Sequence, residues 1–283
     1  MDILDTIEKM RRACRLARRA GKRLGFVPTM GALHEGHLSL IRAAKAQCGA
    51  VAASIFVNPL QFAPTEDLAK YPRRFERDCE LLRNEGVDLL FAPTVEEMYP
   101  EKMITYVTVE GLSDKLCGKS RPGHFRGVTT VVAKLFHIVE PEAAFFGQKD
   151  AVQAVLIRRM VKDLSLPVEI VVCPIVREPE GLAMSSRNAY LDAQQRQQAL
   201  VLSRSLQEVE RLFRAGERDA GRLVAAGKRV FAQEPSVRLD YLEIVDSETL
   251  NPLTQITRPA LAAVAAFVGS ARLIDNLALQ KQS

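Results

Sequence analysis

The chain contains 283 residues, of which 47% are hydrophobic and 26% are charged, and its formal net charge at pH 7 is +5. These values are ordinary for a soluble globular protein, and two domains are expected at this length. The small positive charge is compatible with an anionic substrate, but it is too weak to indicate a nucleic-acid-binding protein.

Alternating helix and strand patterns run through the first part of the chain. The apolar residues of 5–20 recur at helical spacing, and the arginines of this helix are expected to face solvent. The pattern then predicts a strand at 24–28, a helix at 37–47, a strand at 50–57, a helix at 73–85, a strand at 87–92 and an edge strand at 104–109. The run 50–57 is almost entirely apolar, which is typical of a strand buried on both faces of a parallel sheet. This order predicts a doubly wound, Rossmann-like α/β sheet.

The connection between strand 24–28 and helix 37–47 contains glycines and two histidines, and it reads Pro28-Thr-Met-Gly-Ala-Leu-His-Glu-Gly-His37. A strand, a glycine-bearing turn and a helix N-terminus together favour phosphate binding, because unpaired N–H groups and the helix dipole point at the ligand. His34 and His37 can donate hydrogen bonds to phosphate or exchange protons near neutral pH. The alternatives are two ordinary polar residues at a helix start, or a zinc pair, which would need further ligands.

Two further segments carry polar groups suited to a ligand. Gln61 lies in the turn 58–62 after strand 50–57, and ligands of open α/β sheets bind at the carboxyl ends of strands. Its amide suits a carboxylate or a hydroxyl, and the alternative is a turn residue in water. Segment 111–127 is basic and glycine-spaced and precedes a predicted helix at 128–139. This favours a flap that closes on phosphates over an ordinary surface loop.

A second strand-to-helix turn follows the predicted strand 143–147. Lys149 in this turn can neutralise a phosphate. Asp150 can cap the predicted helix 151–164 or hold a magnesium-bound water. Gln153 lies on the first turn of that helix and is expected to face the same crevice.

A loop with two hydroxyls and an arginine, Met184-Ser-Ser-Arg187, follows the predicted strand 168–173. Hydroxyl donors and a bidentate arginine suit a triphosphate, whereas the alternative is capping of the next helix. The remaining sequence predicts helices at 192–215 and 219–232 and strands at 237–245, 261–268 and 273–276. We therefore expect a Rossmann-like domain at 1–176 and a smaller C-terminal α+β domain at 177–283.

The sequence also predicts the compartment. No apolar run has the length of a membrane helix, and no signal-peptide pattern is apparent. The five cysteines are odd in number and have no Cys-x-x-Cys spacing, which predicts reduced thiols in the cytoplasm.

Six segments together resemble the pantoate–β-alanine ligase family of the nucleotidyltransferase superfamily. His34-Glu-Gly-His37 is similar to the superfamily's HIGH motif, and Met184-Ser-Ser-Arg187 is similar to its KMSKS motif. The other matching segments are Phe56–Phe62, Tyr71–Arg73, Gly123–Val128 and Phe146–Asp150. The resemblance spans essentially the whole chain. It implies the condensation of pantoate with β-alanine through a pantoyl adenylate, with ATP and Mg²⁺, in a cytoplasmic homodimer that binds neither nucleic acid nor membrane.

The resemblance also implies roles for individual residues. The implied catalytic residues are His34, His37, Lys149 and Arg187. The implied ATP-binding residues are Met30, Gly31, Ala32, Leu33, His34, Glu35, Gly36, His37, Gly147, Gln148, Lys149, Asp150, Val176, Met184, Ser185, Ser186 and Arg187. Gln61 and Gln153 are implied to bind pantoate, and Gln61 also β-alanine. The family assigns proton donation to His37, while electrostatic stabilisation by the same ring is an equal alternative.

The sequence leaves the magnesium ligands open, with Asp78, Gln148 and Asp150 as possibilities, and it identifies no base for the β-alanine amine.

Three other functions compete. Adenylyltransferases of other substrates share the first motif but are usually shorter. A tRNA-binding module would need an aromatic and basic platform, which residues 190–283 lack. A non-catalytic nucleotide sensor would not need three phosphate-facing loops.

Overall fold

The computed structural model describes residues 1–63, 68–69 and 71–280. The chain divides into two compact units. Unit 1 comprises Met1–Asp114, Gly118–Gly147 and Leu156–Pro174, and unit 2 comprises Lys115–Cys117, Gln148–Val155 and Ile175–Ser283. The boundary at residues 176 and 177 stays a prediction.

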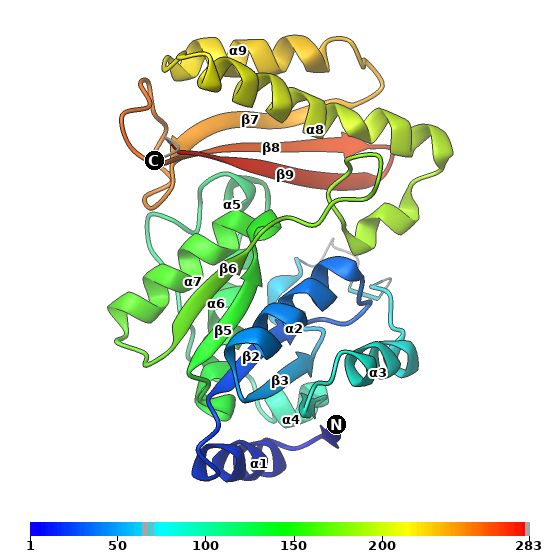
Figure 1. Ribbon diagram of the computed structural model, residues 1–283, viewed down its shortest axis with the longest axis vertical. Helices are drawn as coiled ribbons and strands as arrows, with labels where there is room; N and C mark the ends of the chain where they lie inside the picture. Colours follow the sequence, from blue (N-terminus) through cyan, green and yellow to red (C-terminus); the bar gives the residue numbers. More distant parts are fainter. Residues whose placement is uncertain (64–67, 70, 281–283) are drawn as a thin grey trace. The chain divides into compact units, whose positions relative to one another are not determined.

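Unit 1 contains a six-stranded sheet with the order β1-β4-β3-β2-β5-β6. Figure 1 labels four of these strands, β3, β2, β5 and β6. All five strand pairings are parallel. The strands are β1 (Asp2–Leu4), β2 (Leu24–Thr29), β3 (Ala50–Ile55), β4 (Leu89–Phe91), β5 (Ala143–Gly147) and β6 (Glu169–Cys173). The strand β1 was not predicted, because three residues are too few to show a period.

Helices flank this sheet. They are α1 (Ile7–Arg19), α2 (Glu35–Gln47), α3 (Phe75–Asn84), the short α4 (Val95–Met98), α6 (His124–Val139) and α7 (Ala151–Asp163), whose first residues belong to unit 2. Ile41 of α2 and Leu82 of α3 share a buried cluster with Val27, Leu90 and Phe145 of the strands. The helices α1 and α6 contact each other and the sheet.

The strand order contains a topological switch. From β2 the chain passes through α2 to β3 on one side, whereas β5 pairs with the other side of β2. In open α/β sheets ligands bind at the carboxyl ends of the strands where the order reverses. The segments that follow β2 and β5 are therefore the first places to look for a site.

The edge strand predicted at 104–109 is wrong, because these residues form no strand. The N–H of Val107 donates to Oγ1 of Thr130 (3.0 Å), and its carbonyl accepts from Oγ1 of Thr129 (2.6 Å). The hydroxyl groups of α6 thus make the hydrogen bonds that the backbone of a neighbouring strand would make in a sheet. The alternation of apolar residues does not ensure that every one of them is covered, and Ile104 is 88% exposed.

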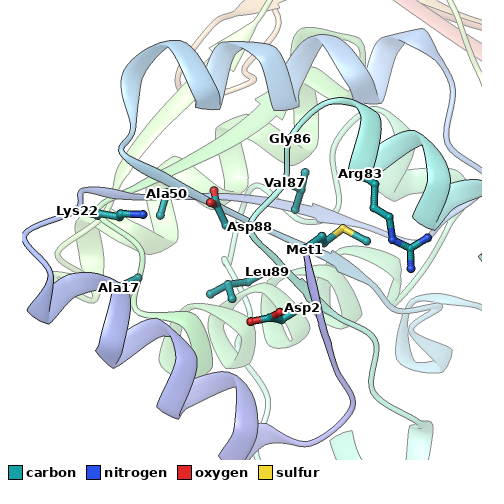
Figure 2. A pocket seen from close by; sticks show the side chains of 10 residues that line it. All are labelled: Met1, Asp2, Ala17, Lys22, Ala50, Arg83, Gly86, Val87, Asp88 and Leu89. Carbon is teal, nitrogen blue, oxygen red and sulfur yellow. The ribbon is translucent and has the colours of Figure 1, made fainter.

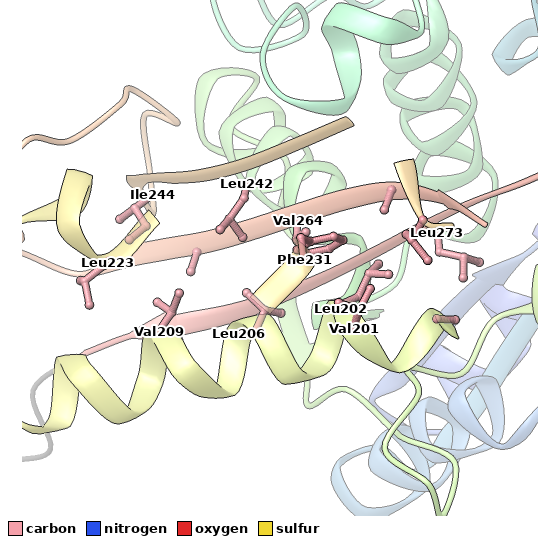
Figure 3. Packing of buried hydrophobic residues seen from close by; sticks show 14 of the residues in the cluster. Val201, Leu202, Leu206, Val209, Leu223, Phe231, Leu242, Ile244, Val264 and Leu273 are labelled. Atoms are coloured by element: carbon pink, nitrogen blue, oxygen red, sulfur yellow. The ribbon is translucent and has the colours of Figure 1, made fainter. Parts of the chain in front are cut away.

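Unit 2 contains an antiparallel sheet of β7 (Arg238–Asp246), β8 (Ala260–Val268) and β9 (Ala271–Leu279). Apolar side chains of α8 (Ala193–Arg214) and α9 (Ala220–Phe231) pack against it (Figure 3). Gly227 allows close approach, because a Cβ there would lie 2.5 Å from Leu242 Cδ2. The other short helical segments of the described residues are η1 (Pro59–Gln61), α5 (Cys117–Ser120), η2 (Gln148–Asp150) and η3 (Ser186–Tyr190).

Two further results concern membrane-spanning helices and the cysteines. Across the described part of the chain, no helix is both long enough and apolar enough to cross a membrane. The five cysteines form no disulfide, and burial raises the pKa of the Cys14 thiol to about 12. A thiol with such a pKa stays protonated and unreactive at neutral pH.

Candidate active site

The segment 30–37, here called the histidine turn, joins β2 to α2. His34 is the N-cap of α2, and its Nδ1 accepts from the N–H of Gly36 (3.2 Å). His37 Nδ1 accepts in turn from the N–H of His34 (3.3 Å), and the two ring centroids are 4.1 Å apart. Because Nδ1 is an acceptor in both rings, the neutral imidazoles carry their protons on Nε2. In this tautomer the Nε2–H of each ring is a hydrogen-bond donor.

Asp78 of α3 holds the other half of the turn. Its carboxylate accepts from the N–H groups of Ala32 and Leu33, each at 2.8 Å, and the residue is 1% exposed. Gly31 has a φ of +84°, and a Cβ there would lie 3.0 Å from Oδ2 of Asp78. Only glycine suits both constraints. Since both carboxylate oxygens are engaged, Asp78 acts as a clamp on the turn, a role that the sequence did not suggest.

The expectation that unpaired backbone N–H groups of this turn face the ligand is wrong for five of them. Besides the four N–H groups already described, Gly31 donates to Oγ1 of Thr29 (3.2 Å). The acceptors are side chains of the turn itself, of Thr29 at the end of β2 and of α3. These five N–H groups therefore form no open backbone cradle for a phosphate.

The remaining residues of the histidine turn are placed as follows. Leu33 is buried in the core cluster, so it contributes packing. Glu35 pairs with Arg42 on the surface of α2, and this hydrogen bond lowers the pKa of Glu35. Met30 is half-buried, and its sulfur lies 2.9 Å from Nε2 of Gln61.

Gln61 lies at the end of η1 (Pro59–Gln61), after β3. The side chain of Asn58 orients this turn with all four of its hydrogen-bonding positions. Its Oδ1 accepts from the N–H of Leu60 (3.3 Å) and the hydroxyl of Tyr99 (2.8 Å). Its Nδ2 donates to the carbonyl of Gly127 (3.1 Å) and to Oε1 of Gln61 (3.2 Å). Burial raises the pKa of Tyr99, so its hydroxyl stays a donor.

The end of the basic segment 111–127 packs against η1. Nδ1 of His124 donates to the carbonyl of Gln61 (2.8 Å), and Nη1 of Arg121 donates to Nε2 of His124 (2.8 Å). A Cβ on Gly127 would lie 2.2 Å from a carbonyl oxygen of η1. This part of the predicted flap is therefore a packed support for Gln61.

The turn after β5 contains Lys149, which is half-buried, and Asp150, which is exposed. Gln153 follows on the first turn of α7 and is also half-buried. Side-chain amide hydrogens of Asn276 in β9 bind the carbonyls of Gln148 and Lys149. Asn276 lies in no recognisable motif, so sequence reasoning had no signal by which to select it.

The loop with the two serines begins as a hairpin over residues 176–184. Arg177 and Ala183 form an antiparallel bridge, and the N–H of Met184 donates to the carbonyl of Val176 (3.0 Å). Val176 and Met184 are half-buried. This pairing fixes the start of the loop.

The end of this loop is capped. Oγ of Ser185 accepts from the N–H of Arg187 (3.3 Å), and Ser185 is the N-cap of η3. Nδ2 of Asn188, a residue that is 4% exposed, donates to Oε1 of Glu178 (2.7 Å) and so ties η3 to the hairpin. The guanidinium of Arg187 is exposed, and Ser186 is half-buried. An exposed arginine beside two hydroxyls can bind phosphate oxygens.

A separate hollow of about 520 Å³ lies at the amino end of the sheet, where β1, β3 and β4 begin (Figure 2). Its charged side chains Asp2, Lys22 and Arg83 are exposed. Asp88 is already engaged by the N–H of Val51 (2.8 Å). The hollow is at the opposite end of the strands from the histidine turn, so we do not place the site there.

Comparison with known proteins decides the family. A family profile described as pantoate-beta-alanine ligase matches residues 2–278. The chain belongs to the pantoate–β-alanine ligase family. The pantothenate synthetase of Koribacter versatilis is 60% identical over 280 residues, which cover 99% of this chain and 96% of that protein. That of Thermotoga petrophila is 56% identical over 279 residues, covering 99% and 100%.

Solved structures of this ligase family share the fold. The crystal structure of pantothenate synthetase from Thermus thermophilus has a TM-score of 0.92 at 48% identity, covering 98% of this chain and 99% of that one. The pantoate–β-alanine ligase from Francisella tularensis, complexed with βγ ATP and β-alanine, has a TM-score of 0.76 at 33% identity, covering 100% and 99%. The predicted fold class is confirmed.

Proposed function

We propose that this ligase condenses (R)-pantoate with β-alanine at the expense of ATP, giving pantothenate, AMP and diphosphate through a pantoyl adenylate. The family match over residues 2–278 carries the proposal. The site chemistry supports it, because the segments that follow β2 and β5 carry two histidines and a lysine.

The reaction requires activation of an acid. A carboxylate is a poor acyl donor, because its leaving group would be an oxide. In the first step a carboxylate oxygen of pantoate bonds to the α-phosphorus of ATP, and the bond to diphosphate breaks. In the second step the amine of β-alanine bonds to the acyl carbon and loses a proton, and AMP leaves with the electron pair. Both steps increase charge on phosphate oxygens, so donors and cations are needed and a protein nucleophile is not.

Residues of three segments suit that role. We assign the Nε2–H groups of His34 and His37, the ammonium of Lys149 and the guanidinium of Arg187 to phosphate oxygens of ATP. Protonation of His37 at Nδ1 would break its bond from the N–H of His34. This favours a neutral ring that stabilises the transition state by hydrogen bonding over a ring that donates its proton.

The other implied contacts remain part of the proposal. We assign ATP contacts to the hydroxyls of Ser185 and Ser186 and pantoate contacts to the amides of Gln61 and Gln153. The Asn58 network supports the assignment of Gln61, since it fixes the amide before a ligand binds. We assign no protein base to the amine of β-alanine.

Magnesium fits this chain as part of the nucleotide substrate. In the described ranges no group of three or more His, Cys, Asp or Glu side chains could hold a metal ion. Asp78 is engaged by the histidine turn, whereas Asp150 is an exposed carboxylate beside Lys149. Mg²⁺ keeps several waters and is often held by substrate phosphates with one or two carboxylates. We propose Asp150 as the protein contact of the ion that ATP brings.

We also propose a cytoplasmic homodimer. The odd number of cysteines and the lack of Cys-x-x-Cys spacing support a reducing compartment. Light scattering measures the mass of the protein in solution and so tests the dimer. A mass equal to that of one chain, 31.4 kDa, would contradict it.

The decisive experiment is pyrophosphate exchange into ATP with pantoate present and β-alanine absent. Exchange that depends on pantoate establishes the adenylate, because only a reversible first step returns labelled pyrophosphate to ATP. No exchange by a folded protein that binds ATP would reject pantoate as the acid. Omission of pantoate is the matched control, since residual exchange would then come from another acid in the preparation.

A further inference from the structure

Two adjacent polar residues interrupt the apolar pattern of β9. Asp275 and Asn276 are 3% and 4% exposed, whereas Leu273 and Leu279 of the same strand belong to the core of unit 2. Buried polar side chains are costly unless their hydrogen bonds are made. Their partners therefore indicate why they are there.

Asn276 uses its amide on the turn that carries Lys149. Its Nδ2 donates to the carbonyls of Gln148 and Lys149, each at 2.9 Å. Its Oδ1 accepts from Nε2 of Gln148 at 2.8 Å. Both donor hydrogens and the acceptor oxygen of the Asn276 amide therefore bond to the consecutive residues Gln148 and Lys149. The position of the Lys149 backbone, and hence the reach of its ammonium group, depends on this one side chain.

Asp275 uses its carboxylate on the hairpin that leads to the serine loop. Its oxygens accept from Nη1 and Nη2 of Arg177 at 2.7 and 3.0 Å, a bidentate ion pair. Nη1 of Arg177 also donates to the carbonyl of Gly181 (3.1 Å). Arg177 pairs with Ala183, directly before Met184. The carboxylate therefore fixes both arms of the hairpin.

Neighbouring residues of a strand point to opposite faces, so one dipeptide can hold two segments that are distant in sequence. We infer that Asp275 and Asn276 are positioning residues for ATP: Asn276 acts through Lys149, and Asp275 acts through the hairpin before Ser185. This inference rests on the proposed function, because it takes both segments as parts of the ATP site. Neither residue touches the reacting atoms.

The test is the kinetics of Asn276→Ala at varied ATP, with folding checked by circular dichroism. A displaced lysine is expected to lower kcat/KM for ATP by about 10-fold to 100-fold. KM for β-alanine is expected to stay within about twofold, since these bonds of Asn276 go to Gln148 and Lys149, which are assigned to ATP. The matched control is Ser205→Ala, which removes a buried hydrogen bond of unit 2 (to the carbonyl of Leu202, 2.7 Å) away from both segments. It is expected to leave KM for ATP unchanged.

A double-mutant cycle separates an effect of Asn276 that acts through Lys149 from an effect on the enzyme that does not involve Lys149. If Asn276 acts through Lys149, adding Asn276→Ala to Lys149→Met lowers kcat/KM for ATP by no more than about twofold. Full additivity of the two losses would overturn the inference. The partly exposed Arg177 offers a variant that is easier to fold, because Arg177→Lys keeps the charge and removes the bidentate pair. It is expected to raise KM for ATP as well.

Failure of this inference differs from failure of the proposed function. A wild-type enzyme that shows no pantoate-dependent pyrophosphate exchange rejects the function. An active wild type, beside a folded Asn276→Ala variant with unchanged kcat and KM for ATP, rejects the inference alone.

Discussion

The carboxylate of Asp78 allows a direct test of how the histidine turn is held. Asp78→Asn keeps the side-chain size but leaves one acceptor oxygen for the N–H groups of Ala32 and Leu33. The second position becomes an NH₂ group that faces an N–H donor in a buried site. A hydrogen bond to a charged acceptor contributes about 1.5–3 kcal/mol. We therefore expect the free energy of opening the turn to fall by about 2–3 kcal/mol.

Hydrogen exchange measures that free energy. A loss of about 2–3 kcal/mol accelerates exchange through local opening by about 30-fold to 150-fold, since 1.4 kcal/mol corresponds to a factor of ten. We expect this acceleration, by mass spectrometry, in peptides that contain Ala32 and Leu33. Because the turn carries both histidines, kcat is expected to fall by about 10²-fold.

The control variant is Asp163→Asn, which makes the same chemical change in an exposed side chain that pairs with Arg159 on α7. It is expected to leave both exchange and kcat unchanged, because exposed ion pairs contribute little. Unaltered hydrogen exchange at Ala32 and Leu33 in a folded Asp78→Asn protein would refute the claim that the carboxylate of Asp78 holds the histidine turn. The turn would then owe its order to the histidine cap and to the bond from Gly31 to Thr29.

Three other predictions concern the reaction, the support of Gln61 and stability at high pH. His37→Ala and Lys149→Ala are each expected to lower kcat by about 10²-fold or more in pyrophosphate exchange, and near-normal turnover would remove that residue from the mechanism. Gly127→Ala should raise KM for pantoate, because the new Cβ would lie 2.2 Å from a carbonyl oxygen of η1, the segment that carries Gln61. Gly49→Ala is the control: its Cβ would have its nearest contact at 3.4 Å, so KM for pantoate should not change. Burial raises the pKa of the Cys14 thiol from 9.0 to about 12, so the unfolded thiol ionises first as pH rises above about 9 and the free energy of unfolding falls. Urea titrations at pH 8 and pH 10 should show this loss, and Cys14→Ala should reduce it.

Hydrophobic periodicity is sufficient to predict most of this fold. The strand β3 is an apolar run and α2 has apolar residues at helical spacing, so local pattern and tertiary burial agree. The same logic fails at 104–109, because a segment that bonds to the hydroxyls of a helix can show the same alternation as an edge strand. Only the bonds of Val107 to hydroxyls of α6 distinguish the two.

The motif residues of the site can be predicted, but their supports cannot. The histidines and Lys149 lie in recognisable turns, whose chemistry follows from residue type and spacing. Asp78 acts on backbone groups 46 and 45 residues away, and Asn276 on groups 128 and 127 residues away. No local pattern records such a partner, since the acceptor or donor is a peptide group that every residue has. Supports of this kind become visible only when the topology is known.

The closed hydrogen bonding of the histidine turn has a consequence for inhibitors. An oxygen of a ligand that is aimed at the backbone of residues 31–34 must break an existing bond, so it gains little affinity. Acceptors aimed at the Nε2–H groups of His34 and His37 leave these backbone bonds intact, because the backbone bonds use Nδ1 of both rings. Because the turn is ordered by its own contacts, a compound that binds there loses little affinity to loop ordering. Compact, rigid compounds with sulfonyl or carboxylate acceptors are therefore the scaffolds that this turn should favour.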